Sequence, residues 1–273
     1  IMDEKELLKE RFKSAVSSTV KVISENFDLD IKFGNSISSK KNSLNLPEIA
    51  NLKKIQDVTN LRAFADSAAL KIKHTNKKIY QENEPEGTMG KALYAIAEKI
   101  RYEKLGSDKL KGVKNNLVQC YESKFKNKKI DEIKTESDVP INEAFELYLR
   151  NHFFKIKQEP IKKKVLSYWK DLFDKGLKSN LKELDNLLEN QSKFGQLISE
   201  LINNLDFEDQ NSKEKEKKQQ NSDESTNPDD DKEESEFSQK QEQEQSDSSN
   251  LSVYENNMEI FSENKDDQQM EFE

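Results

Sequence analysis

Residues 91–117, KALYAIAEKIRYEKLGSDKLKGVKNNL, carry a clear helical pattern. Apolar side chains recur there every three or four residues, which is the period of an amphipathic helix. The pattern predicts a helix over residues 88–104 that ends at Gly106, because a glycine commonly follows the last turn of a helix. Asp108 is expected to cap a second helix directly afterwards. This stretch therefore predicts a helix–turn–helix corner.

The same period continues on both sides of this stretch. It predicts helices over residues 3–26 and 52–73, and several more between Pro140 and residue 205. One short segment, LDIKFG at 29–34, instead alternates apolar and polar residues. Alternation is typical of a strand, and we expect a small β-hairpin over residues 29–46. The fold class predicted is a mainly α, multi-helix domain.

The net charge divides the chain into two parts. Residues 206–273 carry 23 Asp and Glu against 7 Lys and Arg, a net charge of −16, whereas residues 1–205 carry +8. So polar a segment cannot bury enough apolar surface to offset the conformational entropy lost on folding. We expect a helical domain over 1–205 and a disordered acidic tail over 206–273. The tail's apolar segment 251–261 is interpreted as linker sequence or as a short docking motif.

Several kinds of active site lack their residues in this sequence. There is one cysteine, Cys120, and the two histidines, His74 and His152, stand in no metal-binding spacing. No phosphate-binding loop of the form GxxxxGK[ST] occurs. No apolar run is long enough to cross a bilayer, and no signal peptide opens the chain. We expect a soluble, cytoplasmic protein without catalytic, cofactor-binding or metal-binding residues of its own.

The positive charge of residues 1–205 is compatible with binding of nucleic acid. Lysine clusters occur at 124–129 and 162–164, but no nucleic-acid recognition motif accompanies them. The acidic residues of 206–273 would compete for any basic surface, and their docking on it is the simpler explanation of the charge. We expect neither nucleic acid nor a membrane as a partner.

Charged side chains flank the apolar stripe of residues 88–104. Glu98 and Arg101 are three residues apart, which favours an ion pair worth ~0.2–0.5 kcal/mol on an exposed helix. Arg62 and Asp66 have the equivalent spacing of four on the preceding helix. The spacing predicts one network of these four residues between the two helices. A structural role is favoured over a catalytic or ligand-binding one.

Taken together, LRAFADSAALKIKH (61–74) and EKIRYEKLGSDKLKGVKNNL (98–117) resemble the T subunit of the aerobic, ATP-dependent cobaltochelatase. The resemblance extends over nearly the whole chain and is most specific in three motifs. Their residues here are Arg62, Ala65, Asp66, Ala69, Leu70 and His74; Glu98, Arg101, Glu103 and Gly106; Gly112, Val113, Asn116 and Leu117.

The chain departs from the family pattern at identifiable places. Ala63 replaces a glycine, Thr75 replaces an aspartate after His74, and a second nearby histidine is missing. These departures put in doubt any binding by those groups. The von Willebrand A-type domain, with its Asp-x-Ser-x-Ser motif, is also missing. The chain therefore resembles the N-terminal region of the family.

The resemblance implies a non-catalytic adaptor subunit that takes part in cobalt insertion into a corrin ring during cobalamin biosynthesis. Its partners would be an AAA+ ATPase ring subunit and a large tetrapyrrole-binding subunit, in a hetero-oligomer. ATP and magnesium would belong to the ring subunit, and cobalt and corrin to the large subunit. The interaction face expected on this chain consists of Arg62, Asp66, His74, Glu98, Arg101 and Glu103.

Two other functions remain open. The chain could be the adaptor of an AAA+ motor that remodels a different metalloprotein or complex. It could also be an autonomous enzyme that uses Asp66, Glu98 and Arg101. A large chelatase subunit and corrin-ring biosynthetic genes in the same genome would favour the chelatase.

Overall fold

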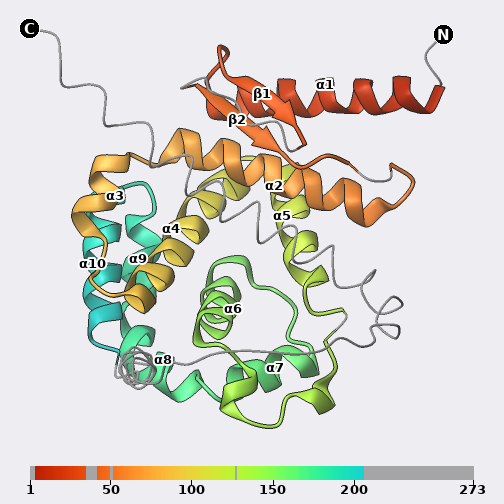
Figure 1. Cartoon of the computed structure of the whole chain (residues 1–273). Coiled ribbons are helices and arrows are strands. Elements are labelled where there is room, and N and C mark those ends of the chain that lie inside the picture. The colour runs from red at the N-terminus through yellow and green to blue at the C-terminus, as the bar shows by residue number, and fades with distance from the viewer. Residues whose placement is uncertain (1–3, 35–41, 50–51, 127, 206–273) are drawn as a thin grey trace, which may run out of the picture. The chain divides into compact units, whose positions relative to one another are not determined.

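The computed structural model describes residues 4–34, 42–49, 52–126 and 128–205 (Figure 1). The acidic tail predicted over 206–273 lies outside these residues. Short 3-10 turns at Ile130–Glu132, Glu136–Asp138 and Lys178–Asn180 connect some of the helices. The main elements are α1 (Glu4–Ser24), β1 (Asp30–Phe33), β2 (Ser43–Leu46), α2 (Ile55–His74), α3 (Lys77–Asn83), α4 (Thr88–Lys109), α5 (Lys111–Ser123), α6 (Ile141–Phe154), α7 (Pro160–Ser167), α8 (Lys170–Leu177), α9 (Leu181–Leu187) and α10 (Gln191–Asn203).

The mainly α fold class is confirmed, and the middle of the helix α2 is buried. Every residue from Leu61 to Leu70 except Arg62 is buried, including the polar Asp66 and Ser67. Four of these residues are alanines, whose small side chains let neighbouring elements approach from several directions. α1 and the strands lie on one side of α2, while α4 and α5 pack on the other (Figure 1).

The predicted corner between two helices is confirmed, but its position at Gly106 and Asp108 is wrong, because α4 continues through both residues to Lys109. The turn to α5 lies at Leu110. Gly106 has a packing role instead: a Cβ atom placed on it would lie 2.3 Å from Cδ2 of Leu70. The glycine therefore lets α4 lie close against α2.

The predicted strand at 29–34 is confirmed, but the hairpin is wrong. β1 and β2 pair in parallel, with Asp30 opposite Ser43 and Phe33 opposite Leu46. A strand of four residues spans about 13 Å. The connection over residues 34–42 is therefore long enough for the chain to return to the start of β1 and run alongside it in the same direction. Leu44 and Leu46 of β2 point into the core that α1 and α2 share.

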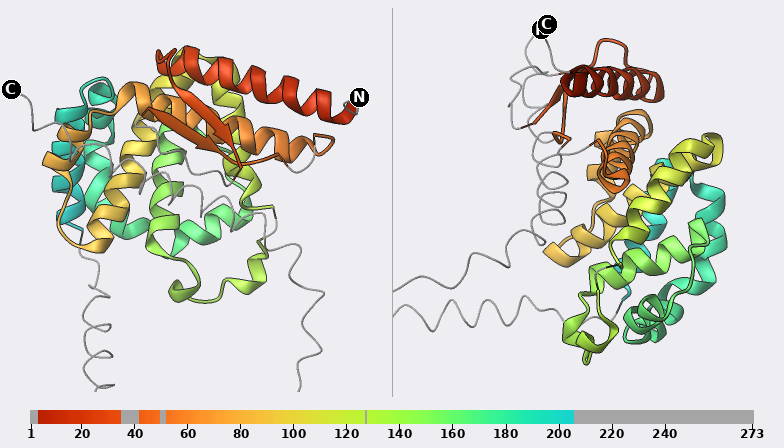
Figure 2. Two further views of the ribbon diagram at one scale, coloured as in Figure 1. Left: turned by 45° about the horizontal axis from the view of Figure 1, so that its top comes forward. Right: turned by 90° about the vertical axis from the view of Figure 1, so that its right-hand side faces the viewer.

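The remaining helices are arranged around α4. α6 and α10 both pack on α4, and α3 packs on α10 (Figure 2). The last of the helices predicted between Pro140 and residue 205 are α9 and α10, which a short connection that includes Leu188 and Asn190 separates. The only tryptophan, Trp169, donates from Nε1 to the carbonyl oxygen of Val139, 2.9 Å away. In the described part of the chain, no helix is both long and apolar enough to cross a bilayer.

Candidate functional site

Glu98 and Arg101 form the ion pair that their spacing predicts, but the pair is buried. Arg101 donates from Nε to Oε1 of Glu98 at 2.9 Å and from Nη2 to Oε2 at 3.2 Å. Only 1% of Arg101 and 2% of Glu98 is exposed. Burial raises the pKa of Glu98, while Arg101 and a hydrogen bond from Gln191 act in the opposite direction. The energetics are therefore those of a buried pair, which has lost its hydration and depends on its partners within the protein.

Arg101 also connects segments that are distant in the sequence. Its Nη1 donates to the carbonyl oxygen of Leu188 at 3.0 Å, and its Nη2 donates to that of His74 at 2.6 Å. Gln191 completes the junction: its Nε2 donates to Oε2 of Glu98, and its Oε1 accepts from the backbone nitrogen of Asn76. The group joins the end of α2, the middle of α4 and the start of α10.

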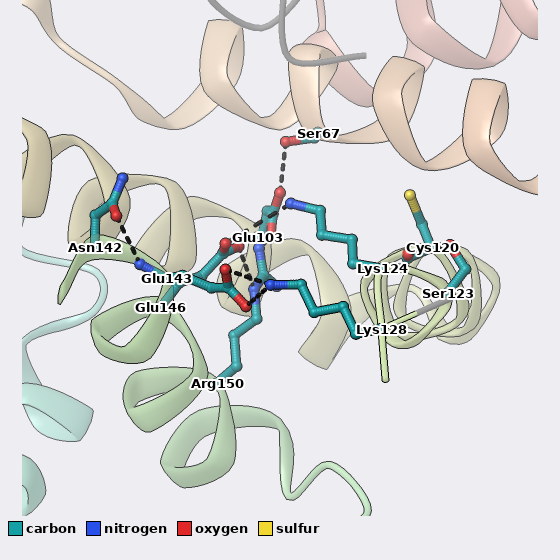
Figure 3. Close-up of polar contacts among 10 residues, drawn as sticks. All are labelled: Ser67, Glu103, Cys120, Ser123, Lys124, Lys128, Asn142, Glu143, Glu146 and Arg150. Carbon is teal, nitrogen blue, oxygen red and sulfur yellow. Dashed lines mark hydrogen bonds and ion pairs between the residues drawn. The ribbon is translucent and has the colours of Figure 1, made fainter. Parts of the chain in front are cut away.

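Glu103 takes part in a second, separate network, which Figure 3 shows between α4, α5 and α6. Its Oε1 accepts from Oγ of Ser67 at 2.6 Å, and its Oε2 accepts from Nη2 of Arg150 at 2.8 Å. Arg150 donates in turn from Nε to Oε1 of Glu146 at 2.8 Å. Lys124 lies 3.7 Å from the other oxygen of Glu146. This chain of contacts ties α2 and α4 to α6.

Aromatic rings complete the environment of Arg150. Its guanidinium carbon lies 4.6 Å from the ring centre of Tyr121 and 5.5 Å from that of Phe154, so cation–π attraction adds to the ion pairs. Burial on its own would raise the pKa of Glu146, but the charges of Lys124 and Arg150 outweigh it and lower this pKa to about 2. Glu146 is therefore ionised at neutral pH and can form ion pairs with Lys124 and Arg150.

The single network predicted from Arg62, Asp66, Glu98 and Arg101 is wrong. Oδ2 of Asp66 accepts from Nδ2 of Asn116 on α5 at 2.8 Å, and among the described residues no ion pair joins it to Arg62. Burial raises the pKa of Asp66, against the effects of Asn116 and of the more distant Arg62. The prediction failed because α2 turns Asp66 towards α5 and not towards α4. Helical spacing cannot reveal which neighbour a face meets.

The six residues expected to form an interaction face differ in accessibility. Asp66, Glu98, Arg101 and Glu103 are buried, whereas Arg62 and His74 are half-buried. Burial, and then the charges of Lys73 and Lys109, lower the pKa of His74. The four buried residues contact other parts of this chain, so they hold helices together. A role of Arg62 and His74 in an interaction stays a prediction.

Sequence reasoning missed two residues that complete these networks. Arg150 stands in FELYLRNHFF (145–154), where apolar residues surround a single arginine, and this could have indicated a buried cation. Gln191 gives no such signal, because a glutamine at the start of a helix is common in any solvated position. The amide of Gln191 finds its hydrogen-bond partners, Asn76 and Glu98, only because α10 packs close to the end of α2.

The networks contain no arrangement typical of a catalytic centre. In the described ranges, no group of three or more His, Cys, Asp or Glu side chains could hold a metal ion. His152 bonds through Nε2 to Asp185 at 2.8 Å, and the side chain of Cys120 is half-buried. The arrangement can fix the relative positions of α2, α4, α6 and α10.

Comparison with known proteins identifies the family. No solved structure matches the chain. The family described as cobalamin biosynthesis protein CobT matches residues 7–273, which is nearly the whole chain and includes all the charged residues described above. The chain therefore belongs to the CobT family of cobalamin biosynthesis proteins.

Proposed function

We propose that this chain is a non-catalytic adaptor subunit of an ATP-dependent cobaltochelatase. In this proposal it couples an AAA+ ATPase ring subunit to a large subunit that inserts cobalt into a corrin ring. ATP and magnesium act on the ring subunit, and cobalt and corrin are substrates of the large subunit. The chain binds none of them and works in the cytoplasm as part of a hetero-oligomer.

One observation supports this proposal most directly. Four of the charged residues through which the chain resembles the chelatase T subunit, Asp66, Glu98, Arg101 and Glu103, are engaged in contacts within the chain, as the pairs Glu98–Arg101 and Glu103–Arg150 show. Buried, paired charges fix how helices are arranged and supply no free acid, base or nucleophile to a substrate. A rigid helical module that acts through its surfaces suits an adaptor.

A reconstitution tests the proposal. The full chain, the AAA+ subunit and the large subunit are mixed with ATP, magnesium, cobalt and a corrin, and metal insertion is followed by absorbance. We expect insertion only when the chain is present. Equal rates with and without it would refute the adaptor role.

A pull-down with the same proteins separates the two adaptor hypotheses. The chain is immobilised and offered each subunit alone, with and without ATP. Retention of both subunits supports the chelatase. Retention of the AAA+ subunit without the large subunit supports an adaptor that remodels a different metalloprotein or complex.

A further inference from the structure

A surface rich in lysine lies where the residues after α5, the connection after α6 and the start of α7 meet. Four exposed side chains form this lysine surface: Lys126, Lys155, Lys157 and Lys163. Lys126 donates from Nζ to the neutral Oε1 of Gln56, 3.5 Å away. Within the described ranges, no ion pair joins any of the four lysines to a carboxylate. Their charges therefore remain available to a partner.

The buried Lys162 holds these three segments together. Its Nζ donates to the carbonyl oxygen of Lys157 at 3.1 Å and lies 5.6 Å from the ring centre of Phe125. Carboxylate oxygens of Glu122 and Glu159 lie 3.8 and 3.6 Å from the same nitrogen. The side chain of Lys162 has no exposed surface, so these two carboxylates offset a buried charge and not the exposed lysines around it.

The surface keeps a positive net charge when its neighbours are included. Three further lysines after α5 are each paired with a carboxylate and add no net charge. These pairs are Lys124–Glu146, Lys128–Glu143 and Lys129–Glu132, of which Figure 3 shows the first two. α7 adds Lys164, and the turn Ile130–Glu132, which packs on α7, adds Asp131. Six lysines, the four exposed ones with Lys162 and Lys164, therefore stand against three carboxylates, which leaves a net charge of +3.

The complementary charge stands in the sequence that follows Leu205. Residues 206–222 carry five acidic and four basic residues, so this stretch is nearly neutral. Residues 223–236, DESTNPDDDKEESE, carry eight acidic residues and one lysine, a net charge of −7. The negative charge is therefore concentrated in one segment of 14 residues, which begins 17 residues after the described domain ends.

The length of the chain allows this acidic segment to reach the lysine surface. Leu205 packs against α8, because a Cβ on Gly176 would lie 2.5 Å from its Cδ2, and α8 packs on α7. Helices of this length measure about 12 Å. The 17 residues 206–222 can span up to about 55 Å. Their length therefore exceeds the distance from Leu205 across α8 and α7.

From this complementarity we infer that the acidic segment 223–236 docks on the lysine surface of its own chain. Each exposed ion pair is weak, but several form together, and covalent attachment gives the segment a local concentration on the order of millimolar. The docked segment covers the lysines, so an acidic partner must displace it to reach them. This contact goes beyond the adaptor role and does not depend on it.

Carbodiimide crosslinking of the full chain tests the inference, because this reagent joins a lysine to a carboxylate only where the two are in contact. An equal mixture of unlabelled and ¹⁵N-labelled chains separates crosslinks within a chain from those between chains. We expect Lys155, Lys157 and Lys163 to be joined to residues 223–236 of the same chain at about 0.1 M salt. These crosslinks should be lost at about 1 M salt, where the screening length falls from ~10 Å to ~3 Å. Their absence at low salt would overturn the inference, and so would crosslinks mainly between chains, which would make a second copy the occupant.

Lysines elsewhere on α5 provide an internal control. Lys111 and Lys114 are also exposed, but they lie at the start of α5, about 20 Å along the helix from its end. We expect them to form few crosslinks to residues 223–236. Crosslinks that are as frequent at Lys111 and Lys114 as at Lys157 and Lys163 would show that the acidic segment has no preferred surface, which contradicts the proposal.

Two triple variants with the same change in charge make the test specific to the acidic segment. The first combines Asp229→Asn, Asp230→Asn and Asp231→Asn, and the control combines Asp206→Asn, Glu208→Gln and Asp209→Asn. In the first variant we expect crosslinks from Glu233 and Glu234 to the lysine surface to fall at least about threefold, since three exposed pairs are removed. The control should keep them, and an unchanged circular dichroism spectrum confirms folding of both. Equal losses in the two variants would mean that overall charge, and not residues 223–236, determines the contact.

Discussion

Arg101 shows how one residue can hold distant parts of this chain together. Its guanidinium group contacts a carboxylate of its own helix and carbonyl oxygens at the end of α2 and in the connection before α10. Lysine could not replace it, because an ammonium group lacks the planar fork that contacts several acceptors at fixed angles. The structural role of Arg101 therefore depends on these tertiary contacts more than on its position in α4.

Replacing Arg101 with alanine is expected to destabilise the protein strongly. The change leaves Glu98 buried without its cation and two carbonyl groups without a donor, and breaking such a pair costs about 3–5 kcal/mol. The loss is measured as the free energy of unfolding in urea, followed by Trp169 fluorescence. Arg62→Ala is the matched control, since this half-buried arginine has no ion pair to Asp66, and its effect should stay within about 0.5 kcal/mol. Equal losses in both variants would contradict the role assigned to Arg101.

At the scale of the elements, the close approach of α2 and α4 depends on small residues. Alanines make up much of the buried part of α2, and Gly106 accommodates the methyl groups of Leu70. Where a side chain would not fit, the helices must separate or the neighbouring side chain must move. The arrangement of these helices is therefore sensitive to single methyl groups.

Gly106→Ala is expected to lower the free energy of unfolding by about 1–3 kcal/mol, because its methyl group would overlap Leu70. Gly112→Ala in α5 is the matched control. Apart from the nearby backbone of α5 itself, no atom lies within 4 Å of a Cβ at that position, so alanine there should be neutral or stabilising by up to about 1 kcal/mol. Urea unfolding of both variants measures the difference. Similar effects at the two glycines would mean that helix propensity, not packing, determines them.

The contact of Lys124, directly after α5, with Glu146 of α6 predicts that stability depends on pH. Lys124 and Arg150 lower the pKa of Glu146 from 4.5 to about 2, after outweighing the effect of burial. A carboxyl group whose pKa is lower in the folded state stabilises the protein above its unfolded pKa, and this contribution is lost as the pH falls through the folded pKa. The stabilisation from Glu146 is therefore present above about pH 5 and disappears towards pH 2.

Glu146→Gln should accordingly reduce the free energy of unfolding by about 2–3 kcal/mol at pH 7, and the difference from the unsubstituted protein should vanish as the pH approaches about 2. Urea titrations over this pH range measure it. Glu183→Gln, at an exposed position of α9, is the control and should show no comparable pH dependence. A difference at Glu146 that stays constant with pH would contradict the ion pairs.

At the scale of the whole molecule, the last turn of α10 and Leu205, two residues after the helix, close the core of the described residues. Ile202 is fully buried, Leu201 and Leu205 are nearly so, and a Cβ on Gly176 would lie 2.5 Å from Leu205. The domain boundary predicted at residue 205 therefore falls just after a residue that the core requires.

A chain that ends after Leu205 is expected to unfold at the same urea concentration as the full chain. A chain that ends after Glu200 loses three buried apolar side chains, each worth about 1.5–3 kcal/mol, and should be at least about 4 kcal/mol less stable. The two truncations are compared by Trp169 fluorescence. If the chain that ends after Leu205 is less stable than the full chain, part of the folded domain lies beyond residue 205.

Local pattern was sufficient for much of the fold. The period of three and four residues identifies α1, α2 and α4, and Pro140 directly precedes α6. Sequence patterns led to wrong predictions where a residue or strand can have either of two structural roles. Gly106 can end a helix or admit a neighbouring side chain, and two short strands can pair in either direction. Contacts with other segments decide between these uses.

The sequence alone determined that the chain is mainly helical, that Glu98 and Arg101 pair, and that the chain resembles the family to which it belongs. These features depend on local spacing and residue identity. Only the tertiary structure decided that the pair is buried, that Glu103 binds Arg150, and that Asp66 faces Asn116. The partners are 47 and 50 residues apart, and a helix face meets its neighbours only after the whole chain has packed.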